Sequence, residues 1–258
     1  MTFCLAMKVA NGLVGIADTR VTSGSECITA RKVTLHEHDG RSFFLMTSGL
    51  RSVRDKVLTY FEEILDLEEV TFDRLYKAVT AFSTQLRRVE EEDRAALEAC
   101  NYQFNLFALM GGQLRHDREH KLYLVYPQGN WVEVGAGTPY CIIGESGYGK
   151  PILDRTLKYT DSLRFALKVG ALAFDSTRIS AANVDFPIDV IIFDQETFKF
   201  RERRYEKQDL APISQWWQER LRQSVNELPS DWQSLVLDEA AEVLAGNTIP
   251  LSGQPRSG

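Results

Sequence analysis

The sequence predicts an α+β fold, a four-layer α-β-β-α sandwich in which two stacked sheets are covered by helices on both outer faces. Three observations predict it. Strand signals fill most of residues 1–48, two amphipathic helices follow, and the later strands are interrupted by a helix that is apolar on most sides. This order favours a sandwich over the regular alternation of strand and helix that is typical of a parallel sheet.

The first two strands form a predicted hairpin. Residues 3–9 and 13–17 are largely apolar runs, and the tight turn Ala10-Asn11-Gly12 separates them. A hairpin of this length brings Asp18 close to the start of the first strand. Thr2 is therefore expected to be anchored in a sheet, although the end of a chain is normally frayed.

The rest of the main domain alternates between strands and helices. A polar loop at 22–26 leads to a strand that opens at 30–33, and two amphipathic helices joined by a short connection are predicted to lie antiparallel on one sheet face. The apolar faces of the two helices carry Val53, Val57, Leu58, Phe61, Ile64 and Leu65, and then Phe72, Leu75, Tyr76, Val79, Phe82, Leu86 and Val89. Other strands are predicted at 42–46, 104–110, 122–126, 131–134, 140–143, 188–193 and 198–200, and the buried helix at 163–174.

The chain changes character after about residue 208. We predict a main domain at 1–208, a helical extension at 209–251 and a disordered tail at 252–258. Trp216 and Trp217 share a helix face with other apolar residues, and a second such face begins at Trp232. Such faces either pack on a core of their own or contact another subunit, where aromatic side chains are enriched.

Thr2, directly behind Met1, is the most informative residue. A cytosolic aminopeptidase removes Met1 when the next residue is as small as threonine. The new first residue would then carry a hydroxyl nucleophile and a free α-amino base together. An α-amino group has a pKa of about 7.7–8, so much of it is neutral near neutral pH. Many chains begin Met-Thr without this role, so the chemistry depends on nearby residues.

Asp18 and Lys32 are the candidates for tuning Thr2. A lysine beside the nucleophile would lower the pKa of its hydroxyl and amine by repelling protons, and an aspartate would hold that lysine charged and oriented. In the plainer interpretation Asp18 is a turn residue and Lys32 is a solvated charge on a strand.

Four segments stand in the order and spacing of proteasome-type peptidases: Thr2, Asp18-Thr19-Arg20, Arg31-Lys32 and Thr47-Ser48-Gly49. The chain resembles the N-terminal-nucleophile hydrolases, which include proteasome β-subunits and HslV. It is most similar to the bacterial Anbu branch, the ancestral β-subunit. The resemblance covers roughly the first 200 residues and is specific at the amino end.

The resemblance implies a role for each matching residue. Thr2 would be the nucleophile, Lys32 and Asp18 its tuning pair, and the Gly49 backbone N–H the oxyanion donor, a task that suits a glycine because substrate can approach it closely. Helper residues near the N-terminal amine would be Ser146, Asp175 and Ser180. Asn183 and Asp185 stand where the Anbu pattern has a serine and a glycine, which leaves open which hydroxyl assists and permits a weakly active site.

Composition excludes several function classes. The 258 residues are 44% hydrophobic and 26% charged, and the net charge of −6 argues against a nucleic-acid partner. The basic cluster Arg201, Arg203 and Arg204 is interpreted as a solvated strand end. The cysteines Cys4, Cys27, Cys100 and Cys141 show no paired spacing, which indicates reduced thiols. Without a leader or a long apolar run, we expect a cytoplasmic protein that does not enter a membrane.

Two motifs suggest other sites. Residues 144–151 match a phosphate-binding loop except that Pro151 replaces the hydroxyl residue that the mechanism needs, so a glycine turn before a helix is the better interpretation. Residues 116–120 match the H-x-x-E-H zinc template, but they lie between two predicted strands, so a charged surface turn is expected.

We therefore expect an N-terminal threonine hydrolase that cleaves peptide or other amide bonds and needs no metal or organic cofactor. The alternatives are a catalytically silent assembly subunit and a nucleotide-binding protein. The resemblance favours a homo-oligomer, either a ring or an open helical assembly, and leaves an unfolding ATPase partner undecided.

The small side chain of Thr2 predicts maturation. Intact-protein mass spectrometry of the chain expressed in bacteria should show the loss of one methionine. A fully retained Met1 in soluble, assembled protein would contradict the hydrolase hypothesis, because the amide bond to Met1 blocks the α-amino base.

Overall fold

A computed structural model describes residues 2–23, 26–38, 41–67 and 72–233. The chain forms two compact units, residues 1–214 and residues 215–258. The first unit holds the sheets and the candidate site.

Two five-stranded sheets form the centre of the first unit. The first has the order β10-β1-β2-β11-β12 and the second the order β5-β6-β7-β8-β9, and every neighbouring pair is antiparallel. The first sheet contains β1 (Phe3–Val9), β2 (Gly12–Asp18), β10 (Tyr140–Gly144), β11 (Ile188–Asp194) and β12 (Lys199–Tyr205). The second contains β5 (Val33–His38), β6 (Arg41–Gly49), β7 (Leu106–Gln113), β8 (Lys121–Val125) and β9 (Trp131–Glu133).

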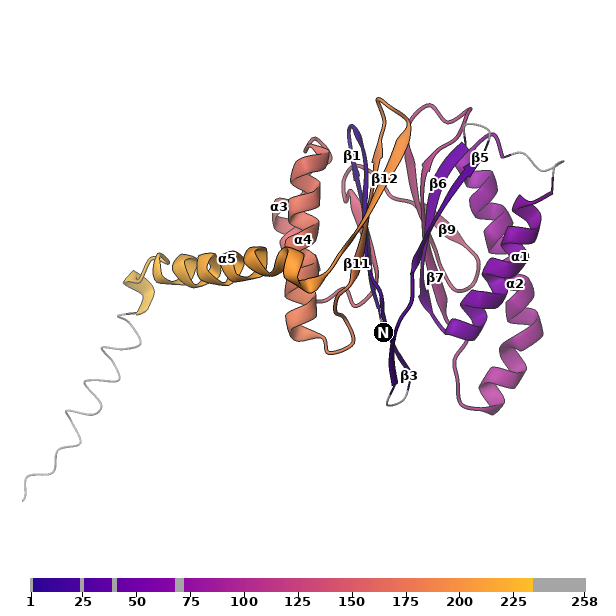
Figure 1. Cartoon of the computed structure of the whole chain (residues 1–258), viewed down its shortest axis with the longest axis horizontal. Helices are drawn as coiled ribbons and strands as arrows, with labels where there is room; N and C mark the ends of the chain where they lie inside the picture. The colour runs from indigo at the N-terminus through magenta and orange to yellow at the C-terminus, as the bar shows by residue number, and fades with distance from the viewer. Residues whose placement is uncertain (1, 24–25, 39–40, 68–71, 234–258) are drawn as a thin grey trace, which may run out of the picture. The chain divides into compact units, whose positions relative to one another are not determined.

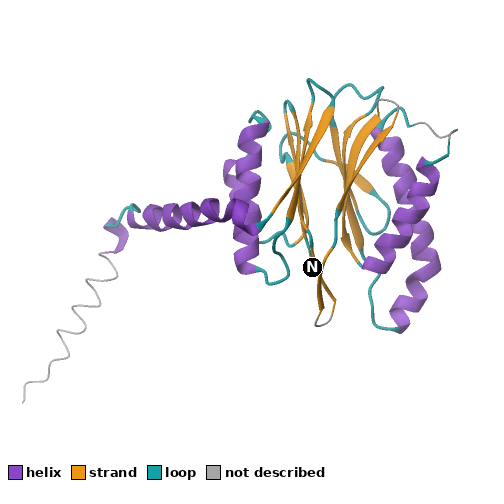
Figure 2. Cartoon of the chain, viewed as in Figure 1, coloured by secondary structure: helices purple, strands orange, loops and turns teal. Residues whose placement is uncertain are grey.

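Helices cover both outer faces of the stacked sheets (Figures 1 and 2). The second sheet is covered by α1 (Arg51–Leu65) and α2 (Leu75–Ala99), and the first sheet by α4 (Leu163–Ser180) with the short α3 (Lys150–Thr156) beside it. The predicted four-layer α-β-β-α sandwich, the fold of the N-terminal-nucleophile hydrolases, is confirmed.

The alternation of side chains along buried strands builds three hydrophobic layers. In β1, Phe3, Leu5 and Met7 pack toward α4, whereas Cys4 and Ala6 point into the layer between the sheets. The third layer fills the space between the second sheet and the helix pair α1 and α2. Strands buried on both faces read as continuous apolar runs, which is why β1 and β2 stand out in the sequence.

The first hairpin has the predicted length. Val9 pairs with Gly12 across the turn and Cys4 pairs with Ala17, so Asp18 reaches the beginning of β1. Strand β1 lies between β2 and β10, which gives Thr2 a fixed position at the end of an interior strand.

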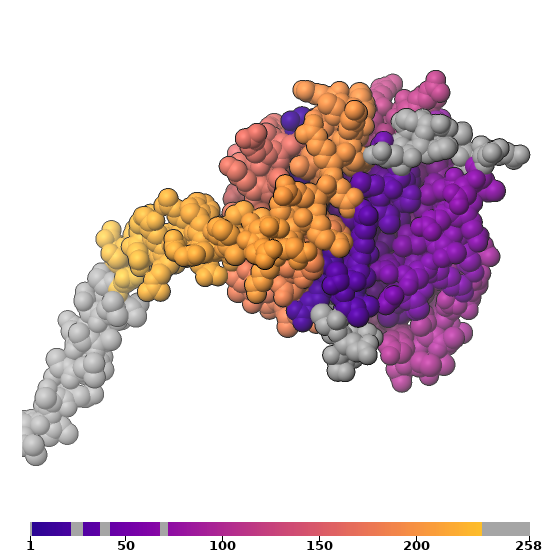
Figure 3. Space-filling view, in the orientation of Figure 1, coloured from indigo at the N-terminus to yellow at the C-terminus, as the bar shows by residue number. Residues whose placement is uncertain are grey.

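Several local predictions were wrong. Within the predicted polar loop at 22–26, Thr22 and Ser23 end β3 (Arg20–Ser23) and Glu26 begins β4 (Glu26–Thr29), and these two strands pair as a small separate hairpin. Residues 24 and 25 lie outside the described residues. The basic cluster is not a strand end, because Arg201 and Arg203 lie within β12, an exposed edge strand that forms part of the surface in Figure 3. Pairing with the buried strand β11 extends β12 beyond its short apolar segment.

Helix α5 (Lys207–Asn226) begins in the first unit and continues into the second, so the predicted boundary at residue 208 falls within this helix. Its exposed apolar residues include Trp216, Leu221 and Val225. Most of the second predicted helical face, from Trp232 to Leu244, and the predicted tail at 252–258 lie outside the described residues.

Candidate active site

Thr2 is fixed by two neighbouring backbones. Its carbonyl oxygen accepts a hydrogen bond of 2.7 Å from the Glu145 N–H, and the next residue, Phe3, pairs with Gly144 of β10. Gly144 has a φ of +90°, and a Cβ atom there would lie 1.9 Å from the Thr2 carbonyl oxygen. Only a glycine allows β10 to approach Thr2 this closely.

The Asp18 carboxylate, which is fully buried, organises the site. Its Oδ1 atom accepts hydrogen bonds from the Thr2 hydroxyl at 2.8 Å, from the Phe3 N–H at 2.7 Å and from the Lys32 ammonium at 2.7 Å. The other oxygen, Oδ2, accepts from the Arg20 N–H at 3.2 Å. The predicted association of Thr2, Asp18 and Lys32 is therefore present in the geometry.

Lys32 is held from a second direction. Its ammonium also donates to the Arg20 carbonyl oxygen at 2.6 Å, and the residue is 6% exposed. Arg20 is positioned by its neighbour Thr19, whose N–H and hydroxyl both donate to the Pro187 carbonyl oxygen, at 3.0 and 2.7 Å. A carboxylate on one side and a carbonyl on the other thus hold the Lys32 ammonium in one orientation.

Gly49 lies at the end of β6 and lines the same cavity as Thr2 and Lys32, a space of about 700 Å³. Its φ is +152°, and a Cβ atom there would lie 2.1 Å from the Asn105 carbonyl oxygen. The position therefore requires glycine, and its backbone borders the space where a substrate carbonyl would lie.

The predicted helper residues are placed less directly. Ser146 follows Gly144 by two positions, and among the described residues its hydroxyl makes no hydrogen bond to Thr2. Asp175 is buried in α4, where it accepts from the Arg178 guanidinium at 2.7 Å, and its Oδ2 is buried without a partner in the described part of the chain. Ser180 is the exposed last residue of α4. The roles of these three residues stay predictions.

Sequence reasoning missed several residues around the site. The Glu145 N–H and the Thr19 hydroxyl each donate to a backbone carbonyl oxygen, of Thr2 and of Pro187 respectively. Bonds to backbone atoms leave no recognisable signal in the sequence. Arg51 and Arg54 line the cavity, although their spacing marks them only as polar positions of an amphipathic helix. Their closeness in the sequence to Gly49, at the junction of β6 and α1, was the one sign that they could border the site.

The other two motifs have structural roles. Lys150 and Pro151 begin α3, and the Lys150 ammonium contacts Asp154 and the Tyr140 hydroxyl. His116 contacts Asp73 on the surface. His120 was wrongly expected in a surface turn, because it is fully buried and donates to the Val9 carbonyl oxygen at 2.8 Å.

Within the described residues, no group of three or more histidine, cysteine, aspartate or glutamate side chains could hold a metal ion. No helix in the described ranges is both long and apolar enough to cross a membrane.

Comparison with known proteins identifies the family. The profile described as "Proteasome subunit" matches residues 2–186, a span that includes Thr2, Asp18 and Lys32. The chain belongs to the proteasome subunit family. A search of curated proteins gave no match.

Solved structures of Anbu proteins are similar over most of the chain. Anbu from Yersinia bercovieri is 30% identical, with a TM-score of 0.81, and the match covers 88% of this chain and 97% of that one. A Gly-1 mutant of Anbu from Hyphomicrobium sp. strain MC1 is 31% identical, also with a TM-score of 0.81, and the match covers 88% of this chain and 99% of that one. The helical assembly of the Anbu complex from Pseudomonas aeruginosa is 28% identical, with a TM-score of 0.83 and coverage of 88% and 97%. This is a proteasome-type, Anbu-like protein.

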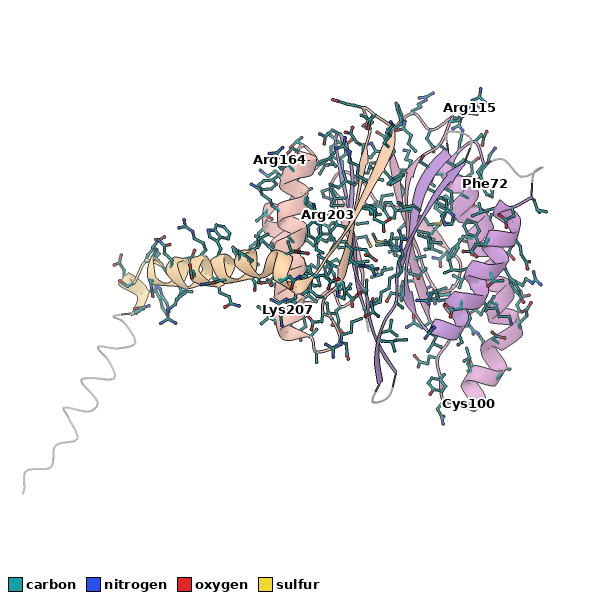
Figure 4. All side chains as sticks on the ribbon, in the orientation of Figure 1. Phe72, Cys100, Arg115, Arg164, Arg203 and Lys207 are labelled. Atoms are coloured by element: carbon teal, nitrogen blue, oxygen red, sulfur yellow. The ribbon has the colours of Figure 1, made fainter. Side chains whose placement is uncertain are left out.

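Cys4, which is buried in the layer between the two sheets, gives a test of how tightly this layer is closed. Burial, more than any other cause, raises the pKa of the Cys4 thiol to about 12, so the reactive thiolate is scarce. During alkylation with iodoacetamide at mildly alkaline pH, followed by peptide mass spectrometry, Cys4 should stay unmodified in the folded protein. Cys100, which is exposed at the end of α2 (Figure 4), should react first. Rapid modification of Cys4 without unfolding would contradict the closed arrangement.

Proposed function

We propose that the chain is an N-terminal threonine hydrolase that cleaves peptide or other amide bonds through an ester intermediate. One observation carries the proposal. The Thr2 hydroxyl and the Lys32 ammonium contact the same oxygen atom of a fully buried aspartate, beside a cavity large enough for a substrate side chain. Such a pairing of nucleophile and charge is what an activated N-terminal threonine needs.

The reaction begins after removal of Met1 exposes the α-amino group of Thr2. The Thr2 Oγ1 atom attacks the substrate carbonyl carbon, and its proton passes to the α-amino group directly or through a water molecule. The tetrahedral intermediate collapses as this proton is delivered to the leaving amine, and the acyl group stays on Thr2 as an ester. Water, deprotonated by the same α-amino group, then attacks the ester and releases a carboxylic acid and the free hydroxyl.

Lys32, Asp18 and Gly49 have supporting roles in this scheme. The Lys32 charge lowers the proton affinity of the neighbouring hydroxyl and amine, and Asp18 holds that charge in place. The Gly49 N–H donates to the oxygen of the tetrahedral intermediate, where negative charge develops. Ser146, Asp175 and Ser180 remain proposed helpers of the amine.

Assembly into a homo-oligomer accompanies this proposal. The similar structure from Pseudomonas aeruginosa is a helical assembly of Anbu. The exposed apolar residues of α5, including Trp216, Leu221 and Val225, are of the kind enriched at contacts between subunits. The reduced thiols expected from the cysteine pattern fit a cytoplasmic location.

The nucleophile is tested by substitution of Thr2. Thr2→Ala keeps the α-amino group but removes the hydroxyl, so turnover of peptide or amide substrates should fall by at least about a thousandfold. Thr2→Ser should retain part of the activity because the hydroxyl and amine remain adjacent. An epoxyketone inhibitor should add to residue 2 in the parent protein and not in Thr2→Ala, since ring closure needs both groups.

The matched control is Thr80→Ala, which removes an exposed hydroxyl on α2 and should leave turnover and labelling unchanged. Turnover that survives Thr2→Ala would place the active site elsewhere. If no substrate is cleaved and neither an epoxyketone nor a β-lactone labels Thr2, the catalytically silent subunit becomes the better description.

Assembly has its own measurement. Sedimentation should give a species well above the 29.3 kDa monomer, with contacts that bury at least roughly 1,000 Å² each. A stable monomer at micromolar concentration would refute the proposed oligomer without affecting the catalytic proposal.

A further inference from the structure

The cavity beside Thr2 is lined by basic side chains. It encloses about 700 Å³, and Thr2 and Gly49 border it where the proposed reaction takes place. None of the described residues that line it is acidic, and its basic residues are Arg20, Lys32, Arg51 and Arg54.

Two of these cations share one counter-ion. The Arg54 guanidinium donates to Asp55 Oδ1 through Nε at 2.9 Å and through Nη2 at 2.6 Å, and Arg51 Nε lies 3.4 Å from Asp55 Oδ2. Asp55 is not among the cavity residues. Among the described residues, two guanidinium charges face one carboxylate here, which leaves about one positive charge uncompensated at this wall of the cavity.

The other two cations, Arg20 and Lys32, have different partners. The Lys32 ammonium donates to Asp18 and to the Arg20 carbonyl, which ties it to the proposed reaction rather than to substrate selection. Arg20 has a longer contact of 3.4 Å with Asp185, and its Nε atom is buried without a partner among the described residues. Arg20 therefore adds positive charge to the cavity lining that Asp185 offsets only at this longer distance.

The start of α1 adds to the positive potential. The helix begins at Arg51, its N-cap residue Leu50 makes no side-chain cap, and its first turn carries no acidic residue. Both Leu50 and Arg51 line the cavity. The partial positive charge of a helix N-terminus thus reinforces the arginines, and no carboxylate in that turn offsets it.

We propose that this cavity binds a carboxylate side chain of the substrate, that of a glutamate or aspartate whose own carbonyl is attacked by Thr2. The inference rests on the proposed hydrolase reaction, because that reaction places the scissile carbonyl between Thr2 and Gly49. The side chain of the same residue is then the part of the substrate nearest the cavity. Arg51 and Arg54 would select it by charge, with guanidinium groups suited to planar carboxylates.

Other side chains fit the cavity less well. A lysine or arginine would meet like charges. A large apolar side chain would displace water from the guanidinium groups without supplying an anion, which carries the cost of burying charge uncompensated. The apolar wall formed by Val21 and Phe107 is compatible with the methylene groups of a glutamate.

The test compares substrates that differ only in the residue before the cleaved amide. N-acetylated tetrapeptide coumarin amides with Glu, Gln, Leu or Lys before the cleaved amide are assayed with the matured protein. We expect the kcat/KM for the Glu substrate to exceed that for its near-isosteric Gln partner by roughly tenfold to a hundredfold, as for other hydrogen bonds to charged groups. The Lys substrate should be the poorest.

Substitutions of the arginines test whether they cause the preference for Glu over Gln. In the double variant Arg51→Gln with Arg54→Gln, the ratio of Glu to Gln cleavage should fall markedly toward one, with only the part due to Arg20 and the α1 N-terminus remaining, while the Gln substrate is still cleaved. The matched control is Arg164→Gln, on α4 in the layer that covers the other sheet (Figure 4), which should keep the full preference. An unchanged preference in the double variant would overturn the assignment.

A binding measurement tests the proposed specificity of the cavity separately from the proposed hydrolase reaction. Fluorescence anisotropy with labelled Glu and Gln peptides is measured on the Thr2→Ala protein with and without the two arginine substitutions. Tighter binding of the Glu peptide that is lost with the arginines supports the cavity even if no cleavage is found and no β-lactone labels Thr2. Labelling of Thr2 with equal cleavage and equal binding of the Glu and Gln peptides would overturn the cavity assignment and leave the hydrolase proposal standing. Equal binding, or none, without labelling would contradict both.

Discussion

The site depends on one buried carboxylate. Asp18 ends β2 with no exposure to solvent, and its two oxygens accept from the Thr2 hydroxyl, from two backbone N–H groups and from the Lys32 ammonium. A buried charge is tolerated when it is paired and its lone pairs are used, and loss of one partner of such a pair costs about 3–5 kcal/mol. The same atoms thus fix the start of β1 and set the charge beside the nucleophile, so stability and chemistry are coupled at this residue.

The scaffold brings these groups together through strand pairing. Thr2 precedes an interior strand, Asp18 ends the neighbouring one, and Gly144 ends the strand on the other side. Gly49 comes from the second sheet, at the point where β6 gives way to α1. The candidate site therefore lies where the ends of both sheets meet, and it needs close backbone approach at Gly49 and Gly144, where a Cβ atom would collide with a carbonyl oxygen.

Features of the fold and of the site that depend on residues close together in the sequence could be predicted, whereas those that depend on tertiary packing could not. The position of Asp18 follows from the hairpin length alone, and the layer order follows from the periodicity of strands and helices. The β3–β4 hairpin was missed because short polar strands resemble loops. Arg51 and Arg54 looked like ordinary solvated charges, because the face of a helix that borders a cavity is set by tertiary packing and not by the helix sequence.

The exposed edge strand β12 has a consequence for the behaviour of the protein at high concentration. Unpaired backbone groups along such an edge invite another chain to add a strand, which is the first step toward cross-β aggregates. The outer strand of this sheet presents Lys199, Arg201 and Arg203, and a second copy of the same strand would bring these cations into register against its own. Electrostatic repulsion between these cations therefore disfavours the addition of a second copy of β12 at this edge.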